Sequence, residues 1–264
     1  MRITVFTSNQ PRHLSLLETL ARFADEVFAV QECNTVFPGR VADFYRKSEV
    51  MQTYFGRVTE AEAAVFGRPR FSPPNVRHLP LKMGDLNLLE LDALGPALHS
   101  DAYVVFGASF IKGPLCELLV ERRAINIHMG TSPYYRGSAC NFWALYDDRP
   151  EYVGATIHRL TAGLDSGPIL FTALPPAESL DGFRLGMRAV KAAHETLAQS
   201  LASGELATLD PIPQDRSLEL RYTRNADFTD EVAAAYLPRA HNPEQIVSRL
   251  DTRDLTRFVR GRVA

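Results

Sequence analysis

Three side chains near the middle of the chain, Asn126, His128 and Asp165, are of the types that acyl transfer to an amine requires. Attack of an amine on a carbonyl carbon creates an oxyanion, which an Asn side-chain N–H can stabilise. The amine must lose a proton and the leaving nitrogen must gain one, and a neutral His128 can accept the first and supply the second. A nearby carboxylate can hold the tautomer of the His and raise its pKa, or order a water that relays the proton. Each of these residue types is also common in turns, surfaces and cores, so their chemistry depends on the fold that positions them.

The sequence around residues 124–128 places two of the three side chains together. AINIH is a short apolar run. Side chains alternate between faces along a strand, so Asn126 and His128 project to the same side. The next segment, GTSPYYRG, is rich in turn formers and ends the strand at His128. In open α/β sheets, this carboxyl edge is where ligands bind. A second strand-like run, VGATIH, leads into the loop RLTAGLDSG, which carries Asp165.

Four motifs occur in a fixed order between residues 126 and 170: N-x-H, P-x-Y-R-G, G-x-T-x-H and L-D-x-G-P-I-L. This order resembles the folate-dependent formyltransferase family, which includes glycinamide ribonucleotide, methionyl-tRNA and nucleotide-sugar N-formyltransferases. The resemblance implies that Asn126, His128 and Asp165 are the catalytic residues, with the Asp 37 positions after the His. One departure is visible: the family usually has S-L-L-P after the His, whereas this chain has Gly-Thr-Ser-Pro at 130–133. We expect this change to reshape the acceptor side of the pocket.

The same resemblance implies 10-formyltetrahydrofolate as cosubstrate. The loop ASFIKGPL would offer backbone groups to the pterin ring, and the loop before Asp165 would close the other side of that pocket. The residues so implied are Phe110, Ile111, Lys112, Thr161, Ala162, Gly163 and Leu164. Phe110 and Ile111 can equally be core residues. The candidate acceptor-binding residues are Ser8, Asn9 and Gln10 at the sheet edge, which can equally be turn and N-cap residues, and Tyr135 and Arg136 of the motif P-x-Y-R-G.

The N-terminal pattern predicts an α/β fold with a doubly wound, mostly parallel, Rossmann-like sheet. MRITVF and DEVFAV are β-rich runs on either side of a segment with Leu14, Leu17 and Leu20 at helical spacing. Further strands are expected at NVRHLPL, DAYVVFG and PILFTALPP. Helices are expected over GDLNLLELDALGPALHS with Asp85 as cap, over GSACNFWALYDD with Ser138 as N-cap and Trp143 in the core, and over the amphipathic segment SLDGFRLGMRAVKAAHETLAQSLASGE.

Two segments differ from this pattern. The aromatic-rich residues 33–75 predict helices near 40–50 and 58–66, which form either a lid or dimer surface or a packed excursion. The composition changes near residue 205, so we expect a catalytic domain over 1–204 and a small, partly helical extension over 205–264, with Thr229 capping one of its helices. The last residues, DTRDLTRFVRGRVA, carry four arginines, for which a solvated terminal helix is expected over contact with a phosphate or a partner subunit.

Composition sets outer limits on function. Hydrophobic residues make up 45% of the chain and charged residues 23%, as in ordinary globular proteins. Three widely spaced cysteines form neither a disulfide framework nor a metal-binding pattern, and no cluster has metal-ligand spacing. We therefore expect a cytoplasmic protein without a metal. No run is long enough to span a membrane, and no signal peptide is evident. A net charge of −2 gives no basic surplus for gripping a nucleic acid.

These observations favour an N-formyltransferase that moves a formyl group from 10-formyltetrahydrofolate to a primary amine. The turn TSNQPRH lacks the glycine-rich phosphate loop of the glycinamide ribonucleotide branch, and the segment 205–264 is too short for the β-barrel of the methionyl-tRNA branch. A nucleotide-linked amino sugar remains as the acceptor by elimination. The alternatives are a 10-formyltetrahydrofolate hydrolase, a transferase for another amine (peptide, metabolite or aminoacyl-tRNA), and a non-catalytic folate-binding regulator. The sequence does not fix the oligomeric state; in a homodimer, residues 33–75 and the C-terminal tail are the candidate contacts.

Overall fold

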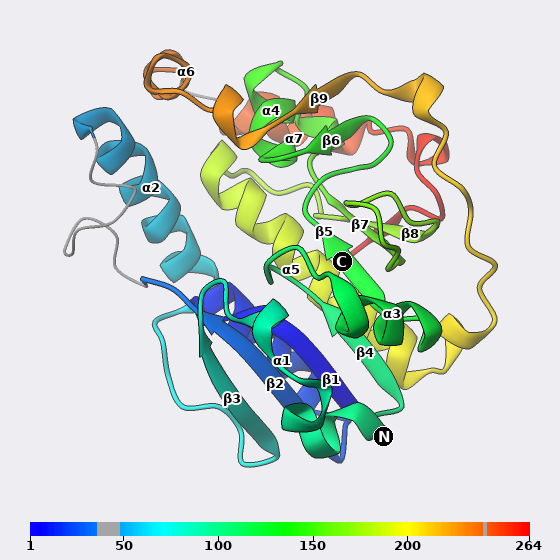
Figure 1. Cartoon of the computed structure of the whole chain (residues 1–264). Helices are drawn as coiled ribbons and strands as arrows, with labels where there is room; N and C mark the ends of the chain where they lie inside the picture. Colours follow the sequence, from blue (N-terminus) through cyan, green and yellow to red (C-terminus); the bar gives the residue numbers. More distant parts are fainter. Residues whose placement is uncertain (36–47, 240–241) are drawn as a thin grey trace.

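The computed structural model describes residues 1–35, 48–239 and 242–264 (Figure 1). The strands are β1 (Arg2–Ser8), β2 (Glu26–Cys33), β3 (Val76–Lys82), β4 (Ala102–Val105), β5 (Ile125–His128), β6 (Tyr135–Gly137), β7 (Ala155–Arg159), β8 (Ile169–Leu174), β9 (Arg221–Thr223) and β10 (Arg262–Val263). The α-helices are α1 (Pro11–Ala21), α2 (Glu49–Phe66), α3 (Gly113–Glu121), α4 (Cys140–Tyr146), α5 (Gly182–Ala202), α6 (Asp230–Tyr236) and α7 (Pro243–Asp251).

Most of the strands form one eight-stranded sheet in the order β10-β8-β7-β5-β4-β1-β2-β3. The five strands from β3 to β5 are parallel to one another, and β5, β7 and β8 pair antiparallel. Strand order reverses between β1 and β4, so the carboxyl ends of these two strands frame the crevice where open α/β sheets bind ligands. The predicted α/β fold with a doubly wound, mostly parallel sheet is confirmed.

Helices cover both faces of the sheet (Figure 1). On one face, Val5 and Val104 pack with Leu17 of α1 and Leu197 of α5. On the other face, the neighbouring strand residues Phe6 and Val105 pack in one cluster with Leu115 of α3 and Leu94 of the segment before β4. Strand residues one position apart therefore enter different cores, as the two-residue period of a strand requires. The long amphipathic helix α5 is confirmed, and Asp181 caps it by accepting from the backbone N–H groups of Phe183 and Arg184.

Three predicted helix details are wrong. The segment before β4 forms short 3₁₀ helices, η2 (Leu86–Leu88) and η3 (Leu91–His99). A regular helix is interrupted there because Gly95 has non-helical dihedrals and Pro96 follows it. Asp85 makes no side-chain capping bond. Ser138 does not cap α4 either, since the N-cap position falls on Ala139. The backbone of Ser138 is instead held by hydrogen bonds to Thr223 of β9.

The described part of the 33–75 segment is packed against the body of the protein. The predicted helix near 58–66 lies within α2, and the one predicted near 40–50 falls largely on residues outside the described ranges. Tyr54 of α2 is buried against Phe142 of α4, Phe228 and Tyr236. Trp143, also of α4, is buried in the same cluster, as expected.

Two strands after residue 205 pair with earlier strands of the chain. β10 pairs with β8, and β9 pairs with β6 in a separate two-stranded sheet. Thr229 caps α6 as expected, by accepting from the N–H of Val232. These residues are partly helical, and the predicted domain boundary near 205 stays a prediction.

The expected solvated C-terminal helix is wrong. The tail has only the 3₁₀ turn η8 (Leu255–Arg257) and the strand β10. Its four arginines each donate to a described partner: Arg253 to Pro175 O, Arg257 to Tyr152 Oη, Arg260 to Leu170 O and Arg262 to Glu205. The guanidinium groups hold the tail to the rest of the protein through two backbone carbonyl oxygens, a tyrosine hydroxyl and a carboxylate.

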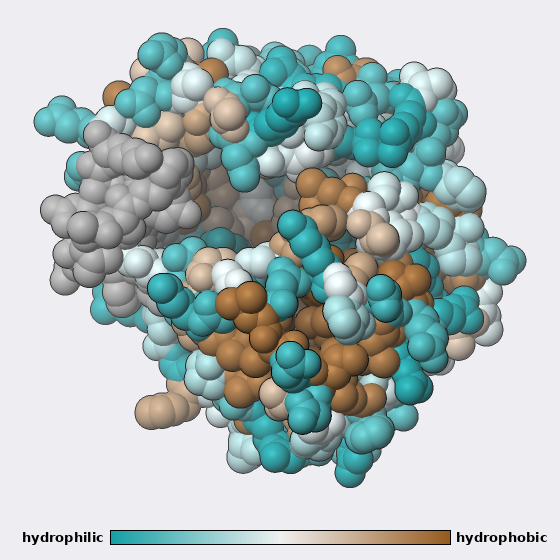
Figure 2. Space-filling model, in the orientation of Figure 1, coloured by the Kyte–Doolittle hydropathy of each residue, from teal (hydrophilic) through white to brown (hydrophobic). Residues whose placement is uncertain are grey.

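Among the described residues, no helix combines the length and the apolar character that crossing a bilayer requires. Figure 2 shows apolar side chains gathered over the lower half of one face of the molecule and a hollow above them.

Candidate active site

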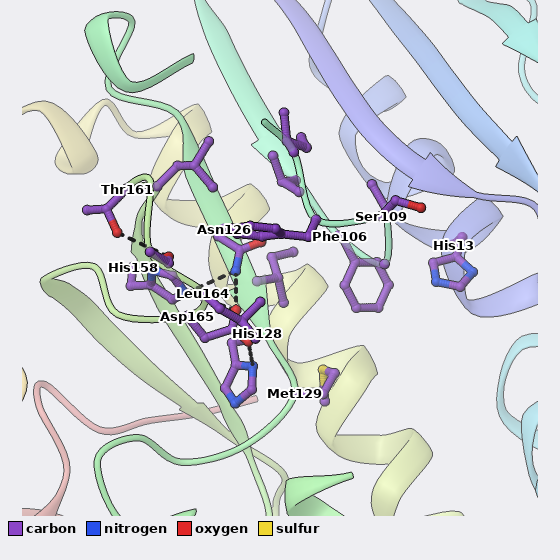
Figure 3. A pocket seen from close by; sticks show the side chains of 18 of the residues that line it. His13, Phe106, Ser109, Asn126, His128, Met129, His158, Thr161, Leu164 and Asp165 are labelled. Atoms are coloured by element: carbon purple, nitrogen blue, oxygen red, sulfur yellow. Dashed lines mark hydrogen bonds and ion pairs between the residues drawn. The ribbon is translucent and has the colours of Figure 1, made fainter. Parts of the chain in front are cut away.

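A cavity of about 450 Å³ opens at the carboxyl edge of β1, β4 and β5. This volume suits a drug-sized or cofactor-sized ligand. One end of the cavity holds Asn126, His128, His158 and Asp165, and the other end holds His13, with Phe106 between them (Figure 3). The cavity therefore lies at the edge predicted from the sequence.

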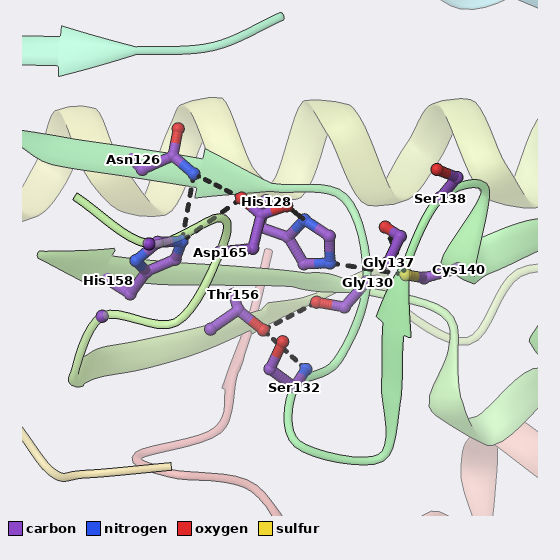
Figure 4. A network of polar contacts seen from close by, with 12 residues as sticks. Asn126, His128, Gly130, Ser132, Gly137, Ser138, Cys140, Thr156, His158 and Asp165 are labelled. Carbon is purple, nitrogen blue, oxygen red and sulfur yellow. Dashed lines mark hydrogen bonds and ion pairs between the residues drawn. The ribbon is translucent and has the colours of Figure 1, made fainter. Parts of the chain in front are cut away.

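The three predicted catalytic side chains meet at one end of this cavity. Asn126 Nδ2 donates to Asp165 Oδ1 at 2.9 Å. His128 Nδ1 lies 3.1 Å from Asp165 Oδ2. One carboxylate thus joins the amide and the imidazole, through its two separate oxygens (Figure 4).

The loop that carries Asp165 has a fixed shape. Asp165 has a φ of +44°, a left-handed conformation that Asp and Asn tolerate better than most residues. Residue 167 is a glycine because a Cβ there would clash with the carbonyl oxygen of Arg159. Gln214, far along the chain, donates from Nε2 to the carbonyl oxygens of Asp165 and Gly167 at 2.9 and 2.8 Å. The residues after 205 therefore help to position Asp165.

His158 is a fourth member of the cluster that sequence reasoning did not single out. Strand β7 pairs with β5 so that His158 lies directly opposite Asn126. Its Nδ1 is 2.8 Å from the carbonyl oxygen of Arg159. A carbonyl oxygen can only accept, so Nδ1 carries a proton. Its Nε2 is 3.0 Å from Asn126 Nδ2 and accepts from it. The motif G-x-T-x-H contained a signal for His158, because its Thr156 and His158 share one strand face.

The orientation of Asn126 follows from these partners. An ionised carboxylate only accepts hydrogen bonds, so the amide nitrogen, and not the oxygen, must face Asp165. Both N–H groups are then occupied, one by Asp165 and one by His158. The carbonyl oxygen points away from both (Figure 4) and is the atom left for a ligand. The expected N–H contact to an oxyanion is therefore not available in this arrangement.

Charges in the cluster are tightly coupled. Burial alone would lower the pKa of His128, but Cys140 and Asp165 outweigh burial and raise this pKa to about 10. Burial alone would raise the pKa of Asp165, but the hydrogen bond and charge of His128 hold it well below its usual range. At neutral pH the pair is an imidazolium and a carboxylate, whereas the sequence reasoning started from a neutral His128.

The residues implied for pterin binding divide into two groups. Phe110, Ile111, Thr161, Gly163 and Leu164 line the cavity. Lys112 and Ala162 are not among the described residues that line it. The Lys112 ammonium lies over the ring of Phe110, 5.5 Å from its centroid, and its backbone N–H donates to Asn87.

The five candidate acceptor-binding residues do not belong to the described cavity lining. The hydroxyl of Ser8 donates to the carbonyl oxygen of Glu32, and Asn9 exchanges hydrogen bonds with Asn34. Gln10 occupies the N-cap position of α1 without a side-chain capping bond. The other two have partners elsewhere: Tyr135 is buried with its hydroxyl on Asp147, and Arg136 pairs with Glu219. Their predicted role in binding an acceptor stays a prediction.

The far end of the cavity is formed by Arg12 and His13 at the start of α1, which sequence reasoning also missed. Arg12 donates to Glu62 of α2 at 2.9 Å. Burial and the neighbouring Arg12 charge hold the pKa of His13 well below its usual value. The ring of His13 packs on Phe106 with 4.9 Å between centroids. This end therefore carries little unpaired positive charge.

A buried carboxylate supports the loop that follows β4. Glu32 is fully buried at the carboxyl end of β2. It accepts from the backbone N–H groups of Gly84 at 2.8 Å and Ser109 at 2.6 Å. Because Ser109 lines the cavity, Glu32 fixes part of its wall. In the part of the chain that is described, no group of three His, Cys, Asp or Glu side chains is arranged to hold a metal ion.

Comparison with known proteins agrees with this geometry. Residues 83–201 match the formyl transferase family. Over 160 residues the chain is 31% identical to a methionyl-tRNA formyltransferase of Synechococcus sp. (strain JA-3-3Ab), covering 60% of this chain and 47% of that protein. The chain thus spans about half the length of the curated relatives it matches.

Two solved structures share the fold. A 4-N formyltransferase from Francisella tularensis superposes with a TM-score of 0.53 at 19% identity, over 86% of this chain and 77% of that one. A sugar N-formyltransferase from a Shewanella species superposes with a TM-score of 0.51 at 18% identity, over 95% and 87%. The α/β fold is therefore the one found in these two solved formyltransferase structures. Residues 83–201, which contain the whole polar cluster, thus match the formyl transferase family, as the motifs indicated.

Proposed function

We propose that this chain is an N-formyltransferase that moves the formyl group of 10-formyltetrahydrofolate to a primary amine. The observation that carries this proposal is the joining of Asn126 and His128 to the two oxygens of Asp165 at one end of a ligand-sized cavity. All three residues lie within the segment that matches the family.

The folate occupies the end of the cavity bounded by the 106–111 and 160–165 segments. Apolar side chains there, including Phe110, Ile111 and Leu164, contact the faces of the pterin ring. Backbone groups of the loop held by Glu32 are available to the ring edge. The formyl group on the folate then reaches the Asn126–Asp165 cluster.

The amine nitrogen attacks the formyl carbon, and the carbonyl electrons move to oxygen. The carbonyl oxygen of Asn126 accepts an N–H of the amine and so directs its lone pair. The imidazolium of His128 supplies positive charge beside the developing oxyanion. His128 takes over the electrostatic part of the role that the sequence suggested for Asn126.

Collapse of the intermediate breaks the bond between the formyl carbon and the folate nitrogen. The Asp165 side chain is 22% exposed and that of His128 is 8% exposed, so the carboxylate faces the reacting atoms with the imidazolium behind it. The carboxylate accepts the proton that the amine loses and then delivers a proton to the folate nitrogen, while the imidazolium behind it stabilises the charge of the carboxylate. The imidazolium–carboxylate pair is thereby restored, and the products are a formamide and tetrahydrofolate.

The acceptor that we propose first is a nucleotide-linked amino sugar. The Arg12 end of the cavity has its guanidinium already paired with Glu62, which suits a sugar or another neutral group better than a phosphate. An aminoacyl-tRNA is the second candidate, because the curated relatives that match this chain are named methionyl-tRNA formyltransferases.

The test is tetrahydrofolate release from 10-formyltetrahydrofolate, with and without a panel of amines. The panel holds dTDP-, UDP- and GDP-amino sugars, glycinamide ribonucleotide and charged initiator tRNA. Wild type is compared with His128→Ala and with the control His99→Ala, which changes a His on η3 outside the cavity lining. Release that depends on one amine, is lost in His128→Ala and persists in the control supports the proposal. Equal release without any amine indicates a hydrolase, and folate binding without release indicates a non-catalytic regulator.

A further inference from the structure

The ring of His128 has partners at both nitrogens. Nδ1 lies 3.1 Å from Asp165 Oδ2, and Nε2 lies 3.4 Å from the sulfur of Cys140 (Figure 4). The same sulfur is 3.3 Å from the carbonyl oxygen of Gly137. A chain of groups thus runs inward from the cavity, from the carboxylate through the imidazole to the thiol.

The local backbone brings Cys140 into contact with the imidazole ring of His128. Cys140 begins α4 and is 1% exposed. Gly130, in the turn after β5, leaves the room for this contact, because a Cβ there would clash with Cys140 Cβ and lie 3.0 Å from His128 Nε2. The turn is held in place by Thr156 of β7, which donates to the carbonyl oxygen of Gly130 at 2.6 Å.

The thiol of Cys140 can form a hydrogen bond with Nε2 in both protonation states of the imidazole. When Nε2 has no proton, the S–H can donate to it. When Nε2 carries a proton, the sulfur can accept that N–H, and the S–H can turn to the carbonyl oxygen of Gly137. Because His128 is only 8% exposed, water has little access to replace the sulfur.

We propose that Cys140 is a positioning residue for His128, which holds the ring on Asp165 and stabilises its charged form through Nε2. The consequence of this contact for catalysis rests on the formyl transfer proposed above. The effect of Cys140 on the position and charge of the His128 ring does not depend on that proposal. Among the described residues, the titratable groups that face His128 are Asp165 in the loop after β7 and Cys140 on α4, with His158 of β7 reaching Asp165 from the other side at 3.8 Å.

The direct test follows the titration of the His128 imidazole by NMR in the full chain with labelled histidine. The signal is assigned by its loss in His128→Gln. Wild type is compared with Cys140→Ala, Cys140→Ser and Cys116→Ala; Cys116 is a second buried cysteine, which packs in the other core on α3. Circular dichroism verifies that each variant is folded, and the hydroxyl of Cys140→Ser keeps the test available should Cys140→Ala fail to fold.

We expect the His128 pKa to fall by about one unit or more in Cys140→Ala. It should return most of the way to the wild-type value in Cys140→Ser, and stay unchanged in Cys116→Ala. The pH profile of formyl transfer should shift in parallel with the titration. An unshifted His128 in Cys140→Ala, or equal shifts in Cys140→Ala and Cys140→Ser, overturns the proposal. Absence of formyl transfer by the wild type counts against the proposed function alone, because the titration is measured without substrates.

Discussion

Replacing Asp165 by Asn removes the negative charge from the centre of the cluster with the least change in shape. The carboxylate accepts from Asn126 Nδ2 at 2.9 Å and lies 3.1 Å from His128 Nδ1. An amide at this position keeps one acceptor and presents an NH₂ group to one of these two donors. Asn also tolerates the left-handed backbone of residue 165, so the loop should keep its fold.

Two losses follow from this substitution, and both act in the same direction. Without the anion, one of the two groups that raise the pKa of His128 is lost, so this pKa falls from about 10. The charged imidazole is then less favoured, and the group that exchanges protons with the substrates is also gone. Acid–base residues of this kind contribute roughly 10²- to 10⁴-fold to rate, so we expect kcat to fall by about 10³-fold.

The assay is amine-dependent tetrahydrofolate release, measured at saturating folate. The matched control is Asp148→Asn, since Asp148 is also an Asp with positive φ but is exposed and lies outside the cavity lining. The control should keep its rate. An Asp165→Asn enzyme within about tenfold of wild type would refute the assignment of the proton exchange to this pair.

Three further predictions concern the groups around the pair. His158→Phe removes the acceptor that holds Asn126, so kcat should fall about tenfold through misorientation while folate affinity, measured by fluorescence titration, stays the same; an unchanged kcat would contradict the positioning role. Glu32 accepts from two backbone N–H groups, and Glu32→Gln replaces one of these charge-assisted acceptors by a donor. The free energy of unfolding in urea should therefore fall by about 2 kcal/mol, and folate should bind more weakly; wild-type stability would contradict this. Because the pKa of His128 is raised to about 10 in the folded state, its stabilising contribution is complete below the ordinary His pKa and is lost as pH rises toward that raised value. Urea unfolding at neutral and at alkaline pH should therefore show a larger loss for wild type than for His128→Gln, and equal losses would count against a charged His128.

Local periodicity was sufficient to predict the parts of the site that one strand carries. Asn126 and His128 share a face of β5 because they are two positions apart, and the loop after the next strand brings Asp165 to the same edge. The parallel sheet followed from alternating strand and helix patterns in the N-terminal part of the sequence. These features depend on neighbours in the chain, so a single sequence shows them.

Contacts between distant segments were not predictable in the same way. His158 meets Asn126 through the register of two antiparallel strands, and that register is set by the whole sheet. Cys140 reaches His128 only because the β6 segment turns the chain back before α4 begins. The C-terminal arginines looked like a solvated charge cluster, yet each finds an acceptor on a strand, a loop or a side chain far away in the sequence. Sequence spacing carries no information about such partners.

The central claim is that the formyl group itself passes from the folate to an amine at this cluster. The most direct measurement supplies 10-formyltetrahydrofolate with ¹³C in the formyl carbon, together with each amine of the panel, and follows the label by NMR and mass spectrometry. The account predicts that the label appears in the formamide of one amine, in an amount equal to the tetrahydrofolate formed, and that His128→Ala abolishes it. Label found only as formate, or label that never leaves the folate with any amine, would contradict the account.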